Sequence, residues 1–266
     1  MFRSTAFTVL AAASLFSATA GARPPHQAPA APTIILVHGA FADASSWDRV
    51  IPRLQANGAS VVAVDNPLTS LEADVAATRR AIAAAPGKVV LVGHSWGGTV
   101  ITEAGVDPKV EALVYVAAFA PDVGQTSAEQ GERFPVAPGL QHLQQDQGRL
   151  SLSADTMRTD FAQDLQPALA RELYAKQLPL TASALAQPVQ AAAWRSRPSW
   201  YVLSRNDRML SPQLQAATAV RIGAELRSLP SSHVSPLSEP RAVAETILEA
   251  AGLIAPAISS PQDTRG

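Results

Sequence analysis

The chain has 266 residues, of which 47% are hydrophobic and 16% are charged, and its formal net charge at pH 7 is -1. This apolar content is enough for one large core, and single α/β domains of this size are ordinary. The balanced charge gives no indication of binding to nucleic acid or to an anionic membrane surface. The sequence contains no cysteine, which excludes disulfides, thiolate metal sites and cysteine nucleophiles.

The N-terminus has the pattern of a secretory signal. A basic residue precedes an apolar run over 6–18, and Ala18-Thr19-Ala20 has the small-residue form of a cleavage site. The run is shorter than the ~20 residues that a membrane-spanning helix requires. We therefore predict a signal peptide over 1–20, with cleavage after Ala20 or alternatively after Ala22. A periplasmic or secreted protein with no stable membrane anchor is expected.

After a Pro- and Ala-rich lead-in over 21–32, short buried strands alternate with helices. Apolar, β-branched runs predict strands at Thr33–Val37, Val61–Val64, Lys88–Val92, Val110–Val116 and Ser199–Leu203, with a shorter candidate at Ala224–Leu229. Helices are predicted over Leu71–Ala85, Gly98–Ala104, Ala168–Gln177 and Arg241–Ala251, the first with a capping box from Thr69 to Glu72. This alternation predicts an α/β fold with a mostly parallel central sheet and helices on both faces.

The alternation of strands and helices stops between about 121 and 197. Because structureless loops of this length are uncommon inside a domain, we interpret the segment as an inserted cap over the sheet edge. The domain is then predicted to span 33–254, followed by a tail over 255–266. The large apolar residues of the cap fit equally well in a pocket wall or in the packing of the cap itself: Phe134, Leu140, Phe161, Leu165 and Tyr174.

The segment Gly93-His94-Ser95-Trp96-Gly97 matches the pattern G-x-S-x-G. The glycines leave room for a sharp turn from strand to helix that holds the serine in a strained conformation. A predicted strand precedes the motif and a predicted helix follows it, which is the context that the motif requires. The pattern therefore predicts that Ser95 is a nucleophile.

A serine nucleophile requires a base and an acid that orients the base. The motif is found in folds in which the base follows the serine and the acid along the chain. Of the five histidines, His233 has this place, because it follows the last strand candidate and precedes the last helix. The other four, His26, His38, His94 and His142, lie elsewhere in the chain. Asp207 lies just beyond the strand before His233 and is the preferred acid. Asp122, which follows an earlier strand, remains the alternative.

The negatively charged oxygen of an acyl-transfer intermediate requires backbone N–H donors. One donor is expected from Trp96, directly after the serine. The second is expected from the loop after the first strand, where spacing alone does not distinguish Ala40 from Phe41. We further expect Phe41 and His94 to contact the substrate, and we expect no metal.

Four segments together resemble the α/β-hydrolase family: Ile35-Leu36-Val37-His38-Gly39-Ala40-Phe41, Gly93-His94-Ser95-Trp96-Gly97-Gly98, Asn206-Asp207 and Ser232-His233. The resemblance is to the branch of plant methyl-ester esterases and hydroxynitrile lyases with its bacterial relatives. It implies that Ser95, His233 and Asp207 form a catalytic triad and that the N–H groups of Ala40 and Trp96 form the oxyanion hole. It also implies a cap over an apolar pocket and no cofactor.

The predicted function is cleavage of carboxylic esters of small to medium apolar substrates through an acyl-enzyme. Hydroxynitrile lyases share the triad, but one plant group has a threonine and a lysine where this chain has Gly39 and Val234. Perhydrolase and C–C hydrolase activities, and a non-catalytic small-molecule receptor, are the remaining alternatives. The expected partner is a small-molecule ester, and a homodimer is an open alternative to a monomer.

Overall fold

A six-stranded sheet forms the centre of the computed structural model, which describes residue 1 and residues 31–256. The strands are β1 (Thr33–Val37), β2 (Ser60–Val64), β3 (Val89–His94), β4 (Val110–Val116), β8 (Ser199–Ser204) and β9 (Glu225–Leu229). Their order is β2-β1-β3-β4-β8-β9 and every neighbouring pair is parallel, which confirms the predicted sheet. The predicted signal peptide, most of the lead-in and the end of the tail lie outside the described residues.

Both faces of the sheet are buried. Ile35 and Val37 of β1 belong to the apolar cluster on one face, whereas Ile34 and Leu36 belong to the cluster on the other. Because side chains alternate between faces along a strand, a strand covered on both sides must be apolar at every position. The continuous apolar runs in the sequence have this cause.

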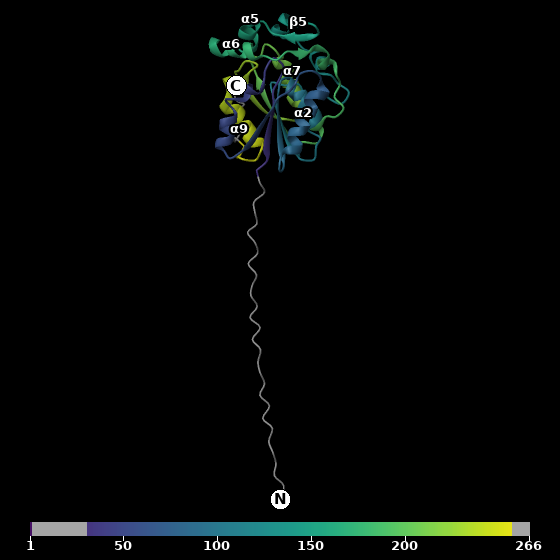
Figure 1. Cartoon of the computed structure of the whole chain (residues 1–266), viewed down its shortest axis with the longest axis vertical. Helices are drawn as coiled ribbons and strands as arrows, with labels where there is room; N and C mark the ends of the chain where they lie inside the picture. The colour runs from purple at the N-terminus through teal and green to yellow at the C-terminus, as the bar shows by residue number, and fades with distance from the viewer. Residues whose placement is uncertain (2–30, 257–266) are drawn as a thin grey trace, which may run out of the picture.

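Helices cover both faces of the sheet (Figure 1). One face packs against α2 (Leu71–Ala84), α3 (Trp96–Ala104) and α7 (Pro212–Arg221). The other packs against α1 (Ile51–Ala56) and α9 (Pro240–Ala250), beside the short helices η1 (Ala44–Trp47) and α8 (Ser235–Ser238). The predicted layers of helix, sheet and helix are therefore confirmed. In the part of the chain that the structure describes, no helix is long and apolar enough to cross a membrane.

The predicted capping box at the start of α2 is wrong by one residue. Ser70, not Thr69, is the N-cap, and its side chain accepts a hydrogen bond from the N–H of Ala73. The preceding turn has Leu68 at a positive φ of 54°, and its N–H donates to the carboxylate of Asp74 inside the helix. This turn brings Ser70 to the capping position. A capping box forms instead at α4, as described below.

The segment between β4 and β8, where the sequence predicts a cap, lies over the carboxyl ends of the strands (Figure 1). Its capping box joins Thr126 to Glu129. A three-stranded antiparallel sheet, absent from the sequence prediction, forms its outer part. The elements are α4 (Ser127–Gly131), η2 (Pro138–His142), β5 (Gln144–Asp146), β6 (Arg149–Ser151), α5 (Ala154–Thr156), η3 (Met157–Phe161), α6 (Pro167–Lys176), β7 (Leu180–Thr181), η4 (Ala182–Ala186) and η5 (Ala193–Arg195).

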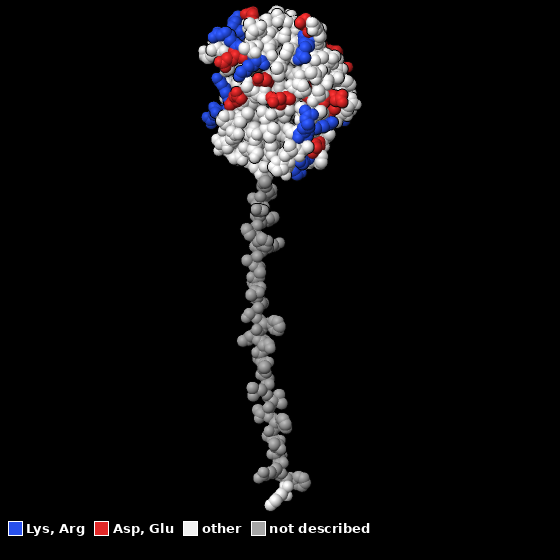
Figure 2. Space-filling model, viewed as in Figure 1, with Lys and Arg blue, Asp and Glu red and all other residues white. Residues whose placement is uncertain are grey.

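On the face shown in Figure 2, basic and acidic side chains are interspersed over the domain. The two signs therefore alternate across this face instead of separating into single-sign patches.

Replacement of Gly97 tests how closely α3 approaches the sheet. A Cβ atom at this position would collide with the carbonyl oxygen of Val37 in β1. Gly97→Ala is therefore expected to lower the free energy of unfolding by about 1–3 kcal/mol, measured by urea denaturation. Gly87, where an added Cβ meets no atom within 4 Å, is the matched control. Gly87→Ala should remain within about 1 kcal/mol of the wild type, and equal losses in both variants would contradict the argument.

Candidate active site

Ser95 lies at the turn between β3 and α3. Its backbone has φ 53° and ψ -119°, a strained conformation for a residue with a side chain. Gly93 and Gly97 make the turn possible, because a Cβ at Gly93 would lie 2.5 Å from the carbonyl oxygen of Gly97. This is the strand–turn–helix geometry that the G-x-S-x-G pattern predicts.

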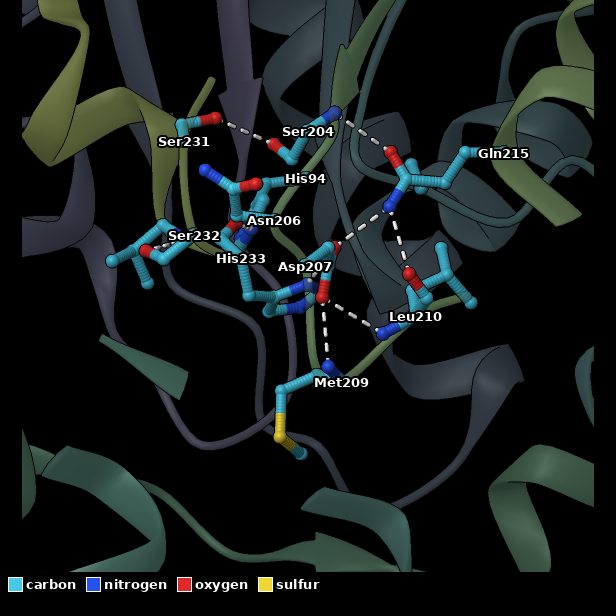
Figure 3. Close-up of polar contacts among 12 residues, drawn as sticks. His94, Ser204, Asn206, Asp207, Met209, Leu210, Gln215, Ser231, Ser232 and His233 are labelled. Atoms are coloured by element: carbon cyan, nitrogen blue, oxygen red, sulfur yellow. Dashed lines mark hydrogen bonds and ion pairs between the residues drawn. The ribbon is translucent and has the colours of Figure 1, made fainter. Parts of the chain in front are cut away.

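The side chains of His233 and Asp207 point toward one another (Figure 3). Nδ1 of His233 lies 2.7 Å from Oδ2 of Asp207, and both side chains are almost completely buried. Because a carboxylate can only accept, Nδ1 carries the proton, and in the neutral imidazole the lone pair is then at Nε2. The arrangement leaves His233 able to take a proton at Nε2.

Asp207 is held by three further donors. The N–H groups of Met209 and Leu210 donate to Oδ1 at 2.7 and 2.9 Å, and Nε2 of Gln215 donates to Oδ2 at 2.8 Å (Figure 3). Gln215 extends from α7 and also accepts a hydrogen bond from the N–H of Ser204 at the end of β8. With the imidazole, four donors fix the carboxylate in one orientation.

Ser95 and His233 line the same cavity. Within residues 31–256 the Ser95 hydroxyl has no hydrogen-bond partner, so it is free to engage His233 or a bound molecule. In unliganded hydrolases the contact between serine and histidine is often loose and tightens with substrate. The structure thus brings together the three residues predicted from the sequence as nucleophile, base and acid.

The loop after β1 carries Ala40 and Phe41, the two candidates for the second backbone donor. The N–H of Phe41 donates to the carbonyl of Leu178 in the cap at 3.2 Å, so it is already engaged. The N–H of Ala40 has no acceptor within residues 31–256, and Ala40 lines the cavity together with Ser95 and Trp96. Trp96 is the first residue of α3, where N–H groups have no partner inside the helix. Ala40 and Trp96 are thus the free donors beside the serine.

His38 holds this loop in place. The N–H of Asn66 donates to its Nε2 at 3.0 Å, so Nδ1 carries the proton and donates to the carbonyl of Gly39 at 2.9 Å. Asn66 Nδ2 donates to the carbonyl of His38 as well. Burial lowers the pKa of His38 because the charged imidazolium is poorly solvated there. A neutral histidine therefore fixes the path of the chain just before Ala40.

His94 does not lie in the cavity wall, and its position differs from the expected substrate contact. Its ring is 1% exposed and packs against His233 with ring centroids 4.8 Å apart. Nε2 donates to the backbone carbonyl of His233 at 2.8 Å. Burial, followed by the neighbouring His233, lowers the pKa of His94 to about 3. His94 thus supports the loop of His233 from behind, whereas Phe41 does line the cavity.

Asp122, the alternative acid, pairs elsewhere. Its two carboxylate oxygens accept from Nε and Nη2 of Arg195 at 2.8 and 2.7 Å, and this guanidinium lowers the pKa of Asp122. His142 lies in the cap, 3.9 Å from Asp160, and His26 lies outside the described residues. Neither Asp122 nor His142 is therefore placed to act on Ser95.

The cavity has a volume of about 310 Å³ and a mostly apolar wall. The cap supplies much of this wall through Phe134, Val136, Leu140, Leu143, Leu150 and Leu180. Of the other cap residues singled out in the sequence, Phe161 packs against the ring of His233, Leu165 joins the core and Tyr174 is 41% exposed. Within the described ranges, no group of three or more His, Cys, Asp or Glu residues is placed to hold a metal ion.

Three supporting residues were not predicted: Asn66, Asp74 and Gln215. Asp74 accepts from Nε1 of Trp96 at 2.8 Å, so it anchors the residue next to the nucleophile. Burial raises the pKa of this carboxyl, while its two hydrogen bonds partly oppose the rise. The sequence carried one usable signal, since Asp74 is the acidic residue on the mostly apolar buried face of α2.

The two buried neutral histidines predict a pH dependence of stability. The folded-state pKa values of His38 and His94 lie below the ordinary value of 6.5, so the unfolded chain binds more protons at mildly acidic pH. Stability should therefore fall as the pH is lowered from 6.5 towards about 3. Each histidine contributes up to about 1.4 kcal/mol per pH unit within its window.

Urea denaturation at a series of pH values measures this effect, and His94→Gln isolates one histidine. The amide N–H of glutamine can still donate to the carbonyl of His233 but does not titrate. The variant should lose less stability on acidification than the wild type. Parallel curves for the two proteins would contradict the assignment of His94 as a buried neutral group.

Comparison with known proteins places the chain in a family. A model of the alpha/beta hydrolase family matches residues 34–246. The chain is 31% identical over 247 residues to Alpha/beta hydrolase nvfD of Aspergillus novofumigatus, covering 83% of this chain and 97% of the relative. It is 32% identical over 116 residues to Methylesterase 2 of Arabidopsis thaliana, covering 38% of this chain and 44% of the relative.

A solved structure of a pyrethroid hydrolase from Sphingobium faniae superposes with a TM-score of 0.71 at 25% identity, over 85% of this chain and 98% of that one. The family match spans the sheet, the turn at Ser95 and the loops of Asp207 and His233. The predicted fold and the predicted resemblance are both confirmed. The chain belongs to the α/β-hydrolase family, and its relatives include plant methylesterases.

Proposed function

We propose that the protein is a serine hydrolase that cleaves carboxylic esters through an acyl-enzyme. The observation that carries the proposal is the joint placement of Ser95, His233 and Asp207. The strained turn exposes the serine to the cavity, and the carboxylate holds Nδ1 of the imidazole, so that Nε2 is the basic atom of the neutral ring. Relatives that are esterases give the proposal further support.

In the first half of the reaction, Ser95 Oγ attacks the ester carbonyl while Nε2 of His233 takes its proton. The negative oxygen of the tetrahedral intermediate accepts from the N–H groups of Ala40 and Trp96. Asp207 stabilises the imidazolium and keeps it oriented. The intermediate collapses as His233 gives the proton to the leaving alcohol, and the acyl group remains on Ser95.

In the second half, water replaces the alcohol. Nε2 of His233 takes a proton from the water as its oxygen attacks the acyl carbonyl, and the same two N–H groups hold the new oxyanion. Return of the proton to Ser95 Oγ releases the carboxylic acid and regenerates the enzyme. The reaction requires no cofactor.

The cavity supports small to medium apolar esters as the substrates. Its carboxylate lining residue, Glu132, is exposed, and apart from Ser95, His233 and two further serines the buried wall is apolar. A substrate carboxylate would lose its hydration in this wall without gaining a cationic partner, which costs several kcal/mol. The lining therefore favours uncharged acyl and alcohol groups.

The position after His38 favours ester cleavage over cyanohydrin cleavage. A Cβ atom at Gly39 would lie 2.7 Å from the Cβ of Ser95, closer than side chains pack. The threonine that a group of hydroxynitrile lyases has at this position would not fit without movement of the backbone. Val234 likewise offers no cation for cyanide.

Ser95→Ala tests the nucleophile. Turnover of p-nitrophenyl butyrate should fall by roughly 10⁴-fold or more, because the hydroxyl that becomes acylated is removed. Circular dichroism should show an unchanged fold. Ser60→Ala, at an exposed position of β2, is the control and should retain wild-type turnover. Turnover that persists in Ser95→Ala would sink the proposal.

Asp207→Asn and Asp122→Asn distinguish the two candidate acids. An asparagine at 207 can no longer hold the protonated Nδ1 of His233 in the required tautomer, so kcat should fall by roughly 10²- to 10⁴-fold. Asp122→Asn breaks only a largely exposed ion pair with Arg195 and should leave kcat within about twofold. If steady-state kinetics show the larger loss of kcat in Asp122→Asn, then Asp122 and not Asp207 is the acid.

A further inference from the structure

One stretch of the cap contacts the loops of both Asp207 and His233. Residues 157–164, here called the docking segment, comprise η3 and the turn that follows it. This segment is far from either loop in sequence and contributes no wall to the cavity. Its contacts reach the acid loop over 206–210 and the base loop over 231–234.

The first link is an ion pair with the acid loop. Asp160 has a side chain only 4% exposed, and its Oδ1 accepts from Nε of Arg208 at 2.7 Å. Arg208 follows Asp207 directly. The N–H of Met209 on its other side donates to Asp207. A buried carboxylate that loses its cation is costly, so this pair holds the backbone of the acid loop against the cap.

The second set of links holds the base loop. The ring of Phe161, which is 1% exposed, packs on the ring of His233 with centroids 5.2 Å apart. Oδ2 of Asp164 accepts from the N–H of Ser232, adjacent to His233, at 2.7 Å. Nε2 of Gln163 donates to the carbonyl of Asn206 at 2.6 Å, which adds a second link to the acid loop. Four consecutive or near-consecutive cap residues thus touch the neighbours of both catalytic side chains.

We propose that the docking segment positions the acid and the base, with Asp160 and Arg208 as its central positioning residues. The inference rests on the proposed function, because it assigns the segment to the proton-transfer step of that reaction. Both loops follow strand ends, and Gln215 and His94 hold them on the core side, whereas the docking segment holds them on the cap side. A displacement of about 1 Å in such a group is enough to lower catalysis by up to 10²-fold.

A double-mutant cycle tests the proposal in the full-length chain. Asp160→Asn and Arg208→Gln should each lower kcat for p-nitrophenyl butyrate by about tenfold, with KM changed by less than about threefold. The double variant should lose little more than either single variant, because both changes break one link. Arg208→Lys, which keeps the charge, should recover part of the loss.

The exposed pair of Arg158 and Asp155 is the matched control. Asp155 directly precedes the docking segment and Arg158 lies in it, their atoms Oδ1 and Nη2 are 2.6 Å apart, and this ion pair joins the cap only to itself. Arg158→Gln and Asp155→Asn should keep kcat within about twofold of the wild type. Equal losses in the control pair would overturn the proposal. Unchanged kcat in Asp160→Asn and Arg208→Gln, with only the melting temperature lowered, would also overturn it.

A substrate-free measurement separates this inference from the proposed function. The hydrogen-bonded Nδ1 proton of His233 gives a far-downfield ¹H NMR signal, assigned by its loss in Asp207→Ala. The signal should shift or broaden in Arg208→Gln. If that variant does not fold, Arg208→Lys takes its place. In the control Arg158→Gln the signal should keep its wild-type position and width. An unchanged signal refutes positioning even if the wild type hydrolyses esters. If the wild-type protein hydrolyses no ester, the proposed function is refuted. The NMR test still shows whether the docking segment positions His233.

Discussion

The backbone of Ser95, held at φ 53° between β3 and α3, is the constraint on which the rest of the site depends. A side-chain-bearing residue in this region costs of order 1–3 kcal/mol, so its surroundings must determine the conformation. They do so through close approach: a Cβ at Gly97 or Gly98 would collide with a backbone carbonyl, and one at Gly39 would collide with Ser95 itself. Packing of the sheet against α3 therefore stabilises the exposed hydroxyl.

Around this turn the site is built from buried polar groups that remain uncharged or fully bonded. His38 and His94 are kept neutral by burial, so each ring can act as one fixed donor. Asp207 is surrounded by donors on both oxygens. In a low-dielectric environment each of these bonds is stronger than in water, and an unmade bond is correspondingly costly. Rigid orientation of His233 follows from this balance.

The sequence predicted those parts of the molecule that depend on local pattern. Apolar runs gave the strands because burial on both faces leaves no polar positions, and the G-x-S-x-G motif gave Ser95 because its geometry is contained within five residues. The sequence favours Asp207 and leaves Asp122 as the alternative acid, since each follows a strand. The choice between them depends on Arg195, far along the chain, which engages both oxygens of Asp122.

Contacts between segments far apart in the sequence also explain the other differences between the prediction and the structure. The choice between the N–H groups of Ala40 and Phe41 depends on the carbonyl of Leu178, which accepts a hydrogen bond from the N–H of Phe41. His94 was expected at the substrate because it adjoins Ser95, but its side chain turns towards the backbone of His233. The small sheet of the cap was missed because β5, β6 and β7 are two or three residues long and β5 is entirely exposed. Such strands have no apolar period to detect.

The cap then serves two separate purposes. Its wall residues, such as Phe134, Leu140 and Leu150, shape the cavity. The docking segment contacts the loops of Asp207 and His233 without lining the cavity. The two sets adjoin, because Phe161 packs edge-on against the wall residue Phe41 and Met209 of the acid loop also lines the cavity. On the proposed mechanism, exchange of wall residues alters which acyl or alcohol group fits, whereas the docking segment acts on proton transfer through its contacts with the loops of Asp207 and His233.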